Sequence, residues 1–235
     1  MNELDILAFG AHPDDVELGI AGILSKCVRK GLKVGIVDLT QGEMGSRGTV
    51  EERKKEAEEA GKIIGISIRD NLCLKDSEIQ NTPEQRLSVI YAIRKYRPKI
   101  IFATMREDKH PDHHHAHFLI KEANYFSGLF KIQTEHEPYR CPTLLFYYPY
   151  YEVKSPDFII DISEYYDIKI DALKAHRSQF FNPEYKGNQT FISSERFWNS
   201  IRDRCAYWGS KINVSFAETI YTIEPINLSS LKIII

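Results

Sequence analysis

The chain has 235 residues, and its 43% hydrophobic content is enough for a sizeable core without disulfide bonds. Its formal net charge is −2, from 31 basic and 33 acidic residues, so no overall field favours nucleic acid or an anionic membrane. The opening MNELDILAFG lacks the basic segment of a secretory signal, and no apolar run approaches the roughly 20 residues of a spanning helix. The four cysteines are widely spaced, which is typical of reduced thiols in the cytoplasm. These features exclude a disulfide scaffold and predict a cytoplasmic protein.

Strand-like and helix-like patterns alternate in the first half of the chain. Short apolar runs predict strands at 4–11, 33–40, 71–74 and 99–105. Helical spacing and helix-stop signals predict helices at 16–30, 49–64, 83–96 and over the segment 113–126. Strands separated by helices of this length imply right-handed crossovers, and therefore an α/β fold with a mostly parallel sheet covered by helices on both faces.

The character of the chain changes after about residue 135. Aromatic and apolar runs predict strands at 141–153 and 157–163, followed by a long helix at 165–181 and then short helical or extended pieces. No linker or repeat interrupts the chain. We therefore expect a single domain over 1–235, with a core at about 1–135 and a C-terminal extension at about 136–235 that covers a site.

Polar clusters follow three of the predicted strands. They read AHPDD after the first strand, TQGEMGSRGT after the second and MREDKHPDHHHAH after the fourth. In an open parallel sheet, ligands bind beyond the carboxyl ends of the strands. We therefore expect the three clusters to meet at one edge of the sheet and to form a site.

The residue types in these clusters indicate a metal. Zinc binds imidazole nitrogen and carboxylate oxygen, and catalytic sites combine three protein ligands with one open position. His12 and Asp15 are three residues apart across a turn and can reach one ion. The motif HPDH offers His110 and His113 at the same spacing, so one of them can bind the metal while the other remains free for catalysis.

The same residues also allow purely structural interpretations and a different kind of ligand. His-Pro-Asp often forms a helix-capping turn, and the histidines of the run 113–117 could form a solvated helix face. A dinucleotide site would need a glycine-rich turn at this place. Here Pro13 removes an amide and two carboxylates repel phosphate. Nucleotide binding is therefore disfavoured, whereas two clusters at one sheet edge favour the metal.

Taken together, the motifs resemble those of the LmbE-like (PIG-L) family of metal-dependent N-deacetylases. AHPDD and HPDH carry the resemblance, GEMGSRGT with the following EER and ALKAHRSQF extend it, and it spans roughly residues 4 to 185. The likeness is greatest to the branch that deacetylates N-acetylglucosaminyl-malate in bacillithiol biosynthesis. It implies a Rossmann-like fold, one zinc per subunit and a homo-oligomer, often a hexamer. Oxygen and nitrogen ligands also accept Fe²⁺ or Co²⁺.

The resemblance also implies roles for individual residues. It makes three residues the metal ligands: His12, Asp15 and His113. Asp14 corresponds to the general base, His110 to the cationic residue that stabilises the oxyanion, and Asp112 to the residue that orients His110. The roles suit amide hydrolysis, since a carboxylate beside a zinc-activated water can accept its proton.

Substrate contacts are less sharply defined by the sequence. Arg53 could bind a carboxylate or sugar hydroxyl, although an arginine on a helix often pairs with a neighbour four residues away. The loop before it offers further candidates: Glu43, Met44, Ser46 and Arg47. Some relatives have a tyrosine just before HPDH, where this chain has Arg-Glu-Asp-Lys at 106–109. Three further residues remain without a clear role: Arg140, His176 and Arg177.

The sequence thus predicts a zinc-dependent hydrolase that removes acetyl from an N-acetylglucosamine conjugate. It predicts a small N-acetyl sugar as the partner and neither nucleic acid nor membrane. Within the same class, the alternatives are another small N-acetyl sugar and the amide of a thiol conjugate. A non-catalytic metal-binding module is a further alternative, but such a module would need no spare carboxylate beside its ligands. A two-metal phosphoesterase would need more ligands than these clusters offer.

Overall fold

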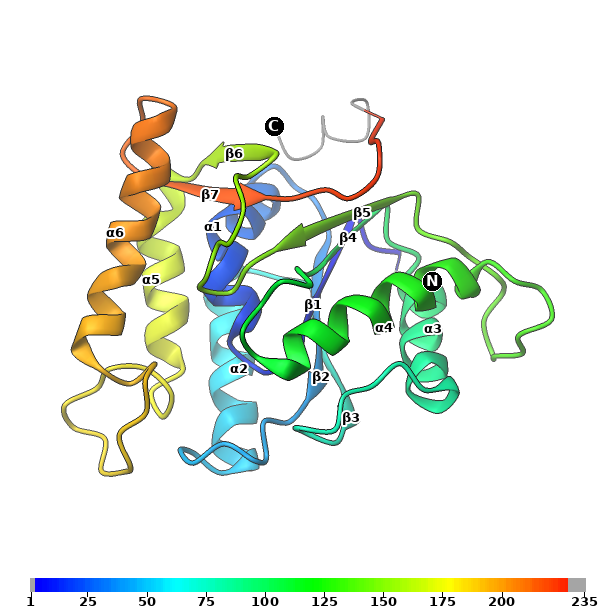
Figure 1. Ribbon diagram of the computed structural model, residues 1–235, viewed down its shortest axis with the longest axis horizontal. Coiled ribbons are helices and arrows are strands. Elements are labelled where there is room, and N and C mark those ends of the chain that lie inside the picture. Colours follow the sequence, from blue (N-terminus) through cyan, green and yellow to red (C-terminus); the bar gives the residue numbers. More distant parts are fainter. Residues whose placement is uncertain (1–2, 228–235) are drawn as a thin grey trace.

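A five-stranded parallel sheet forms the centre of the computed structural model, which describes residues 3–227 (Figure 1). Its strands are β1 (Ile6–Gly10), β2 (Val34–Thr40), β3 (Ile68–Leu74), β4 (Ile100–Thr104) and β5 (Thr143–Tyr147). They lie in the order β3-β2-β1-β4-β5, and each neighbouring pair is parallel. The predicted parallel α/β fold is therefore confirmed. The ends of the predicted domain, 1–2 and 228–235, lie outside the described residues.

Helices cover both faces of this sheet (Figure 1). One face carries α1 (Asp15–Arg29), α2 (Val50–Ile64) and α5 (Tyr166–Ala175), and the other carries α3 (Pro83–Tyr96) and α4 (Pro111–Ser127). Side chains of a strand alternate between the two faces. In β1, Ile6 and Ala8 pack in the α1 core, whereas Leu7 and Phe9 pack in the α3–α4 core. Both faces of the sheet are therefore buried.

The C-terminal part adds a two-stranded antiparallel ribbon and one more long helix. The ribbon consists of β6 (Phe158–Asp161) and β7 (Ala217–Ile220), and a short 3₁₀ turn (Ser163–Tyr165) precedes α5. The helix α6 (Glu195–Lys211) has 17 residues where the sequence predicted only short pieces. Its buried stripe, Phe197, Ile201 and Cys205, repeats every four residues, which is the signal that could have revealed it.

Helix α5 ends earlier than the sequence predicts, at Ala175 rather than near residue 181. At His176 the backbone leaves the helical region, with φ −78° and ψ 59°. The turn that follows carries Ser178 and Gln179 to Arg47 in the loop after β2, with which both make hydrogen bonds. Tertiary contacts with that loop therefore oppose the local helical preference.

Candidate active site

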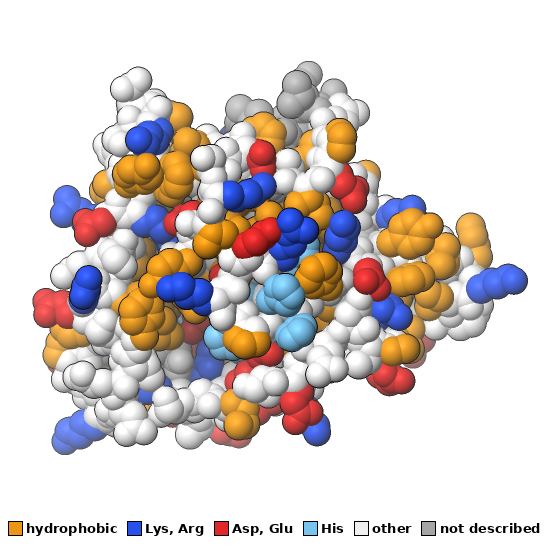
Figure 2. Space-filling model, in the orientation of Figure 1, with side chains coloured by type: hydrophobic (Ala, Val, Ile, Leu, Met, Phe, Trp, Pro, Cys, Tyr) orange, Lys and Arg blue, Asp and Glu red, His pale blue; other side chains and the backbone are white. Residues whose placement is uncertain are grey.

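The polar clusters after β1, β2 and β4 meet at one edge of the sheet, around a cavity of about 290 Å³. Histidine side chains gather near the middle of the face shown in Figure 2, over the region where α4 begins. Seven residues of the clusters line this cavity: His12, Asp14, Asp15, Met44, Gly45, His110 and His113. The turn after β3 adds Asp76 and Ser77 to the same cavity.

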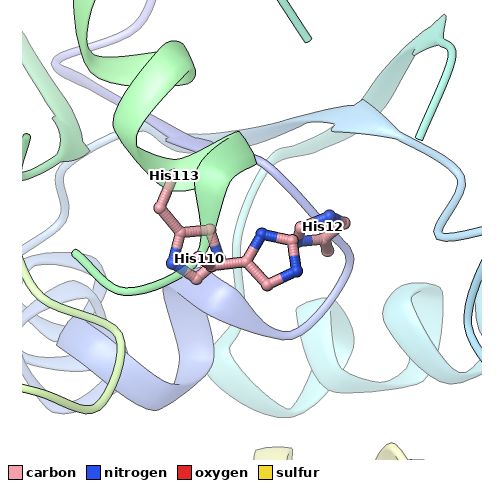
Figure 3. Close-up of side chains that lie close together, drawn as sticks. All are labelled: His12, His110 and His113. Atoms are coloured by element: carbon pink, nitrogen blue, oxygen red, sulfur yellow. The ribbon is translucent and has the colours of Figure 1, made fainter. Parts of the chain in front are cut away.

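The carboxylate of Asp15 lies between two imidazoles. Its Oδ2 is 3.4 Å from Nδ1 of His12, and its Oδ1 is 3.0 Å from Nε2 of His113. The backbone amide of His12 also donates to Asp15 Oδ2, at 2.8 Å, which fixes the turn from β1 into α1. All three side chains are buried. Figure 3 shows the two imidazoles close together, His12 from the loop after β1 and His113 from the first turn of α4.

Each of these imidazoles has a second carboxylate on its other nitrogen. Nε2 of His12 lies 3.1 Å from Asp76 Oδ1 and 3.3 Å from Asp112 Oδ2. Nδ1 of His113 lies 3.1 Å from Asp108 Oδ1. An imidazole with a carboxylate on the nitrogen that faces away from an ion is the usual arrangement of a metal-binding histidine. The arrangement leaves Nδ1 of His12 and Nε2 of His113 facing the Asp15 carboxylate.

The carboxylates give this site a strong preference for positive charge. Burial opposes protonation of His113, but Asp15 and Asp108 outweigh it and raise the pKa of His113 to about 9. Burial likewise opposes protonation of His12, and Asp112, Asp15 and Asp76 raise the pKa of His12 well above its usual value. Burial works against ionisation of Asp15, yet the two imidazoles hold the pKa of Asp15 well below its usual range. A bound cation could supply the positive charge that protons supply here.

Within residues 3–227, two groups of side chains that could bind a metal bring their potential ligand atoms within 4.8 Å of one another. One consists of His12, His110 and His113, and the other of His12, Asp76 and Asp112. The nitrogen and oxygen donors of this cavity suit zinc. The ring centroid of His110 lies 4.8 Å from those of both His12 and His113. Figure 3 shows the three side chains together.

Asp14 is buried beside this cluster and has a different partner. It stands at the N-cap position of α1, but its side chain makes no capping hydrogen bond. Its backbone has φ 133°, a region that residues with a side chain rarely adopt. Oδ2 of Asp14 lies 3.4 Å from Nη2 of Arg53. Burial raises the pKa of Asp14 to about 6, although Arg53 opposes the rise. Asp14 is therefore a carboxylate suited to exchange protons near neutral pH.

His110 is held by the backbone of α4. It is the N-cap of that helix, and its Nδ1 accepts a hydrogen bond of 3.2 Å from the amide of Asp112. The carboxylate of Asp112 instead accepts from the amide of Ser77, at 2.8 Å, and contacts His12. The expected contact between His110 and the Asp112 carboxylate is thus replaced by a backbone one. Burial, with the neighbouring imidazoles, lowers the pKa of His110, so a neutral ring with its proton on Nε2 is favoured over the expected cation.

Arg53 reaches the cavity from the first turn of α2, which Thr49 and Glu52 cap reciprocally. Its Nη1 donates to the carbonyl of Gly42, at 2.9 Å, and its Nη2 donates to that of Pro13, at 3.0 Å. Gly42 has φ +69°, and a β-carbon there would lie 1.9 Å from Arg53 Nη1. The glycine therefore makes room for the guanidinium that joins the first two loops.

Of the other predicted substrate residues, some line the cavity and some lie outside it. Met44 lines the cavity and is 68% exposed, while Glu43 and Ser46 are exposed and do not line it. Arg47 is buried away from the cavity. Its guanidinium donates to the carbonyls of Ser178 and Asn188 and stacks on the ring of Tyr185.

Several cavity residues were not predicted from the sequence. Asp76 follows β3, so the rule about strand ends could have identified it. Tyr150 lines the cavity with its ring 6.0 Å from that of His113, although its aromatic run predicted only a strand. The C-terminal part contributes four more residues: Gln179, Thr190, Phe191 and Ile192. Gln179 lies in the segment ALKAHRSQF that extends the family resemblance, whereas no local pattern in the sequence marks the other three.

The three residues without a clear role lie outside the cavity. His176 is buried, with Nε2 3.3 Å from Glu17 Oε1. Arg177 forms an exposed ion pair of 3.1 Å with Glu59, and Arg140 donates to the carbonyl of Tyr125.

Comparisons with known proteins place the chain in a family. The sequence model of the PIG-L family, GlcNAc-PI de-N-acetylase, matches residues 7–124. Diacetylchitobiose deacetylase of Thermococcus kodakarensis is 32% identical over 190 residues, which cover 74% of this chain and 70% of the relative. A probable N-acetyl-alpha-D-glucosaminyl L-malate deacetylase 2 of Bacillus subtilis is 28% identical over 216 residues, which cover 82% of this chain and 96% of the relative.

A solved structure also resembles the chain over most of its length. The conserved protein TT1542 from Thermus thermophilus superposes with a TM-score of 0.86 at 38% identity, covering 95% of this chain and 96% of that one. The family expected from AHPDD and HPDH is therefore confirmed, and the chain belongs to the PIG-L, or LmbE-like, family of deacetylases.

Proposed function

We propose that the protein is a zinc-dependent N-deacetylase of N-acetylglucosamine conjugates. The observation that carries this proposal is the pair of adjacent aspartates with separate surroundings. Asp15 faces two imidazoles, whereas Asp14 is paired with Arg53 and lines the cavity. A site that merely bound a metal for stability would have no use for the second, unliganded carboxylate.

The donor set fits a zinc ion. His12 through Nδ1, His113 through Nε2 and the carboxylate of Asp15 would hold it, because each of these nitrogens contacts the Asp15 carboxylate while the other nitrogen of each ring faces a different carboxylate. When bound, the ion supplies a Lewis acid that makes water acidic enough for deprotonation near neutral pH. Fe²⁺ or Co²⁺ could occupy the same donors.

The residues around the donor set would handle the protons. Asp14 accepts a proton from the attacking water, and the oxygen of that water forms a bond to the acetamide carbonyl carbon. His110, with Nδ1 occupied by the Asp112 amide, presents Nε2–H as the donor to the developing oxyanion. The proton held by Asp14 then passes to the departing nitrogen as the C–N bond breaks. The products are acetate and a free amine.

The malate glycoside of the bacillithiol pathway is the specific substrate that the motifs favour, and the Bacillus subtilis relative supports it. A neutral second sugar is the other candidate, which the Thermococcus kodakarensis relative supports. One observation favours the neutral candidate: among the described residues, Arg53 is the only lysine or arginine that lines the cavity, and three acceptors already engage it. A malate carboxylate would have to compete with them.

The assembly and compartment also belong to this proposal. We propose a cytoplasmic homo-oligomer, with a hexamer favoured by the family resemblance, and a single functional domain whose C-terminal part covers the cavity. Within residues 3–227, no helix is long and apolar enough to cross a membrane.

An amine-release assay tests the activity and the substrate together. The purified protein, stripped with a chelator and reloaded with zinc, would be offered N-acetylglucosamine, its malate glycoside, its inositol glycoside and diacetylchitobiose. We expect release that disappears with the chelator and returns with zinc. Absence of release from all four substrates by the zinc-loaded protein would contradict the proposed function, and hydrolysis of a phosphate monoester instead would favour a phosphoesterase.

A further inference from the structure

Helix α1 is not one continuous helix. Ile20 has φ −141° and ψ 19°, so the segment 15–19 forms a separate first turn. In an unbroken helix, the amides of residues 22 and 23 would donate to the carbonyls of residues 18 and 19. The break disturbs this pattern in a part of α1 where Glu17, Leu18, Ile20, Ala21 and Ile23 are at most 1% exposed. Buried backbone groups with disturbed helical bonds are costly unless other residues also bond them.

Two cations from the C-terminal part satisfy the carbonyls. Nζ of Lys169, on α5, donates to the carbonyls of Glu17 and Leu18 at 3.0 and 2.7 Å. Nη2 of Arg204, on α6, donates to the Leu18 carbonyl at 2.7 Å. The side chain of Lys169 is 0% exposed, which is rare for lysine.

One anion satisfies the amides. Glu218, on β7, accepts from the amide of Gly22 at 3.1 Å and from that of Ile23 at 2.7 Å. The same carboxylate lies 2.6 Å from Nζ of Lys169. A single buried ion pair therefore spans the break, with its cation on the carbonyl side and its anion on the amide side.

The first turn of α1, which this ion pair contacts, begins at Asp14 and Asp15 of the site. The amide of Leu18 donates to the carbonyl of Asp14 at 3.0 Å, and the Leu18 side chain lines the cavity. Asp14 has an unfavourable φ of 133°, and such a conformation persists only where the surroundings over-determine it. From the other side, Arg69 and His176 contact the carboxylate of Glu17 in the same turn.

We propose that Lys169 and Glu218 are positioning residues: they fix the first turn of α1 and thereby hold Asp14 and Asp15 in their working geometry. The inference rests on the proposed function, because it assigns Asp14 and Asp15 to catalysis and metal binding. It gives the C-terminal part a second task besides covering the cavity. A buried ion pair adds little to stability compared with apolar residues of similar size, so its retention at this break is better explained by placement of the turn.

The test compares variants that remove the ion pair at the break in α1 with a control variant that removes a buried charge elsewhere in the protein. The double variant Lys169→Met/Glu218→Gln removes both charges at once, whereas Glu218→Gln alone keeps an acceptor oxygen for the α1 amides but leaves the buried Lys169 charge unpaired. The control is Arg94→Met: Arg94 is also buried, donates to the carbonyls of Ser127, Leu129 and Ile132, and does not line the cavity. Three measurements are made on each: hydrogen exchange of the segment 14–24 in metal-free protein, zinc affinity by competition with a chromophoric chelator, and kcat and KM.

For both variants at the break, we expect faster exchange at 14–24, a zinc affinity about tenfold lower and a kcat about tenfold lower, with KM within about twofold. The control should lose thermal stability while its exchange at 14–24, zinc affinity and kcat stay at wild-type values. If Glu218→Gln and the double variant both bind zinc and turn over like the wild type, the pair is merely structural and the proposal is overturned. Exchange and zinc affinity need no substrate, so a wild-type protein that binds zinc but releases no amine would contradict the proposed function and leave this inference testable.

Discussion

The guanidinium of Arg53 lies 3.4 Å from the carboxylate of Asp14, and the same nitrogen donates to the carbonyl of Pro13. Arg53 therefore holds both the side chain of Asp14 and the backbone of the residue before it. This contact separates the two neighbouring aspartates: one is paired with a cation of the protein, and the other faces the imidazoles.

Asp14→Asn should abolish catalysis without loss of metal. The amide can still accept a hydrogen bond from Arg53, so the turn is kept, but it cannot take a proton from water. We expect kcat to fall by at least about 100-fold, with zinc content unchanged by elemental analysis. Full activity in this variant would show that another group is the base.

Arg53→Lys should lower kcat more than it raises KM. A lysine keeps the charge but cannot reproduce the planar set of bonds to Gly42, Pro13 and Asp14. We expect kcat to fall about tenfold, since the general base is displaced. Steady-state kinetics check the split. A large rise in KM at constant kcat would instead indicate that Arg53 binds the substrate, as the sequence suggests.

His113→Ala and His110→Ala should separate metal binding from catalysis. His113 has one nitrogen on the Asp15 side and the other on Asp108, so its removal should release zinc. His110→Ala should retain zinc while kcat falls about 100-fold, as for loss of an oxyanion donor. Zinc titration of both variants is the measurement. The opposite pattern would exchange their roles and favour the ligand group that contains His110.

Arg47→Leu should loosen the wall that closes the cavity. Arg47 holds the carbonyl of Asn188, close in sequence to Phe191 and Ile192, which line the cavity. We expect a higher KM, with zinc affinity unchanged, and faster hydrogen exchange over 182–194. If KM rises while exchange there stays at the wild-type rate, Arg47 contacts the substrate directly, as the sequence predicts.

His117 should make the protein less stable in acid. Burial lowers the pKa of His117 to about 4 from an ordinary 6.5, and its Nδ1 lies 3.0 Å from the carbonyl of Thr104. Between these pH values His117 is protonated in the unfolded chain but not in the folded protein. The free energy of unfolding therefore falls as pH drops from about 6.5 towards 4, by up to about 3 kcal/mol. Urea unfolding of chelator-treated protein at pH 7 and pH 5 measures the effect.

The control for this prediction lies two residues away. His117→Asn keeps a donor for the Thr104 carbonyl but cannot titrate, so it should show a smaller loss of stability in acid than the wild type. His115 is exposed, and His115→Asn should behave like the wild type. An unchanged pH dependence in His117→Asn would assign the acid sensitivity to other groups.

Local patterns predicted the regular elements well wherever a residue's preference and its tertiary surroundings agree. Helix α3 begins at Pro83 and ends at Tyr96, as its spacing and its N-terminal proline indicate. The predicted length of helix α5 was too great, because the turn at His176 depends on contacts with Arg47, about 130 residues earlier in the chain. The strand β7 has only four residues and depends on pairing with β6, which a short segment does not reveal by itself.

The residues of the site likewise fall into those that sequence patterns predict and those that only the tertiary structure reveals. His12, Asp14, Asp15, His110 and His113 follow strands that end at one edge of the sheet, so motif and topology together bring them into one cavity. Tyr150 and the segment 190–192 reach that cavity from the C-terminal part, whose course over the sheet no local pattern encodes. The role of Lys169 was equally hidden, since nothing in the helical periodicity of 16–30 marks a break at Ile20.

The break in α1 has a consequence for where this protein can be cut. Residues 7–124 match the family sequence model, which makes them look like a self-sufficient unit. Their first helix nevertheless depends on Lys169, Arg204 and Glu218, all of them beyond that stretch. A fragment that ended near residue 135 would lack the three side chains that bond the backbone carbonyls and amides at the break in α1. We therefore expect such a fragment to aggregate rather than fold. Excision, circular permutation or fusion should therefore keep residues 7–220 together.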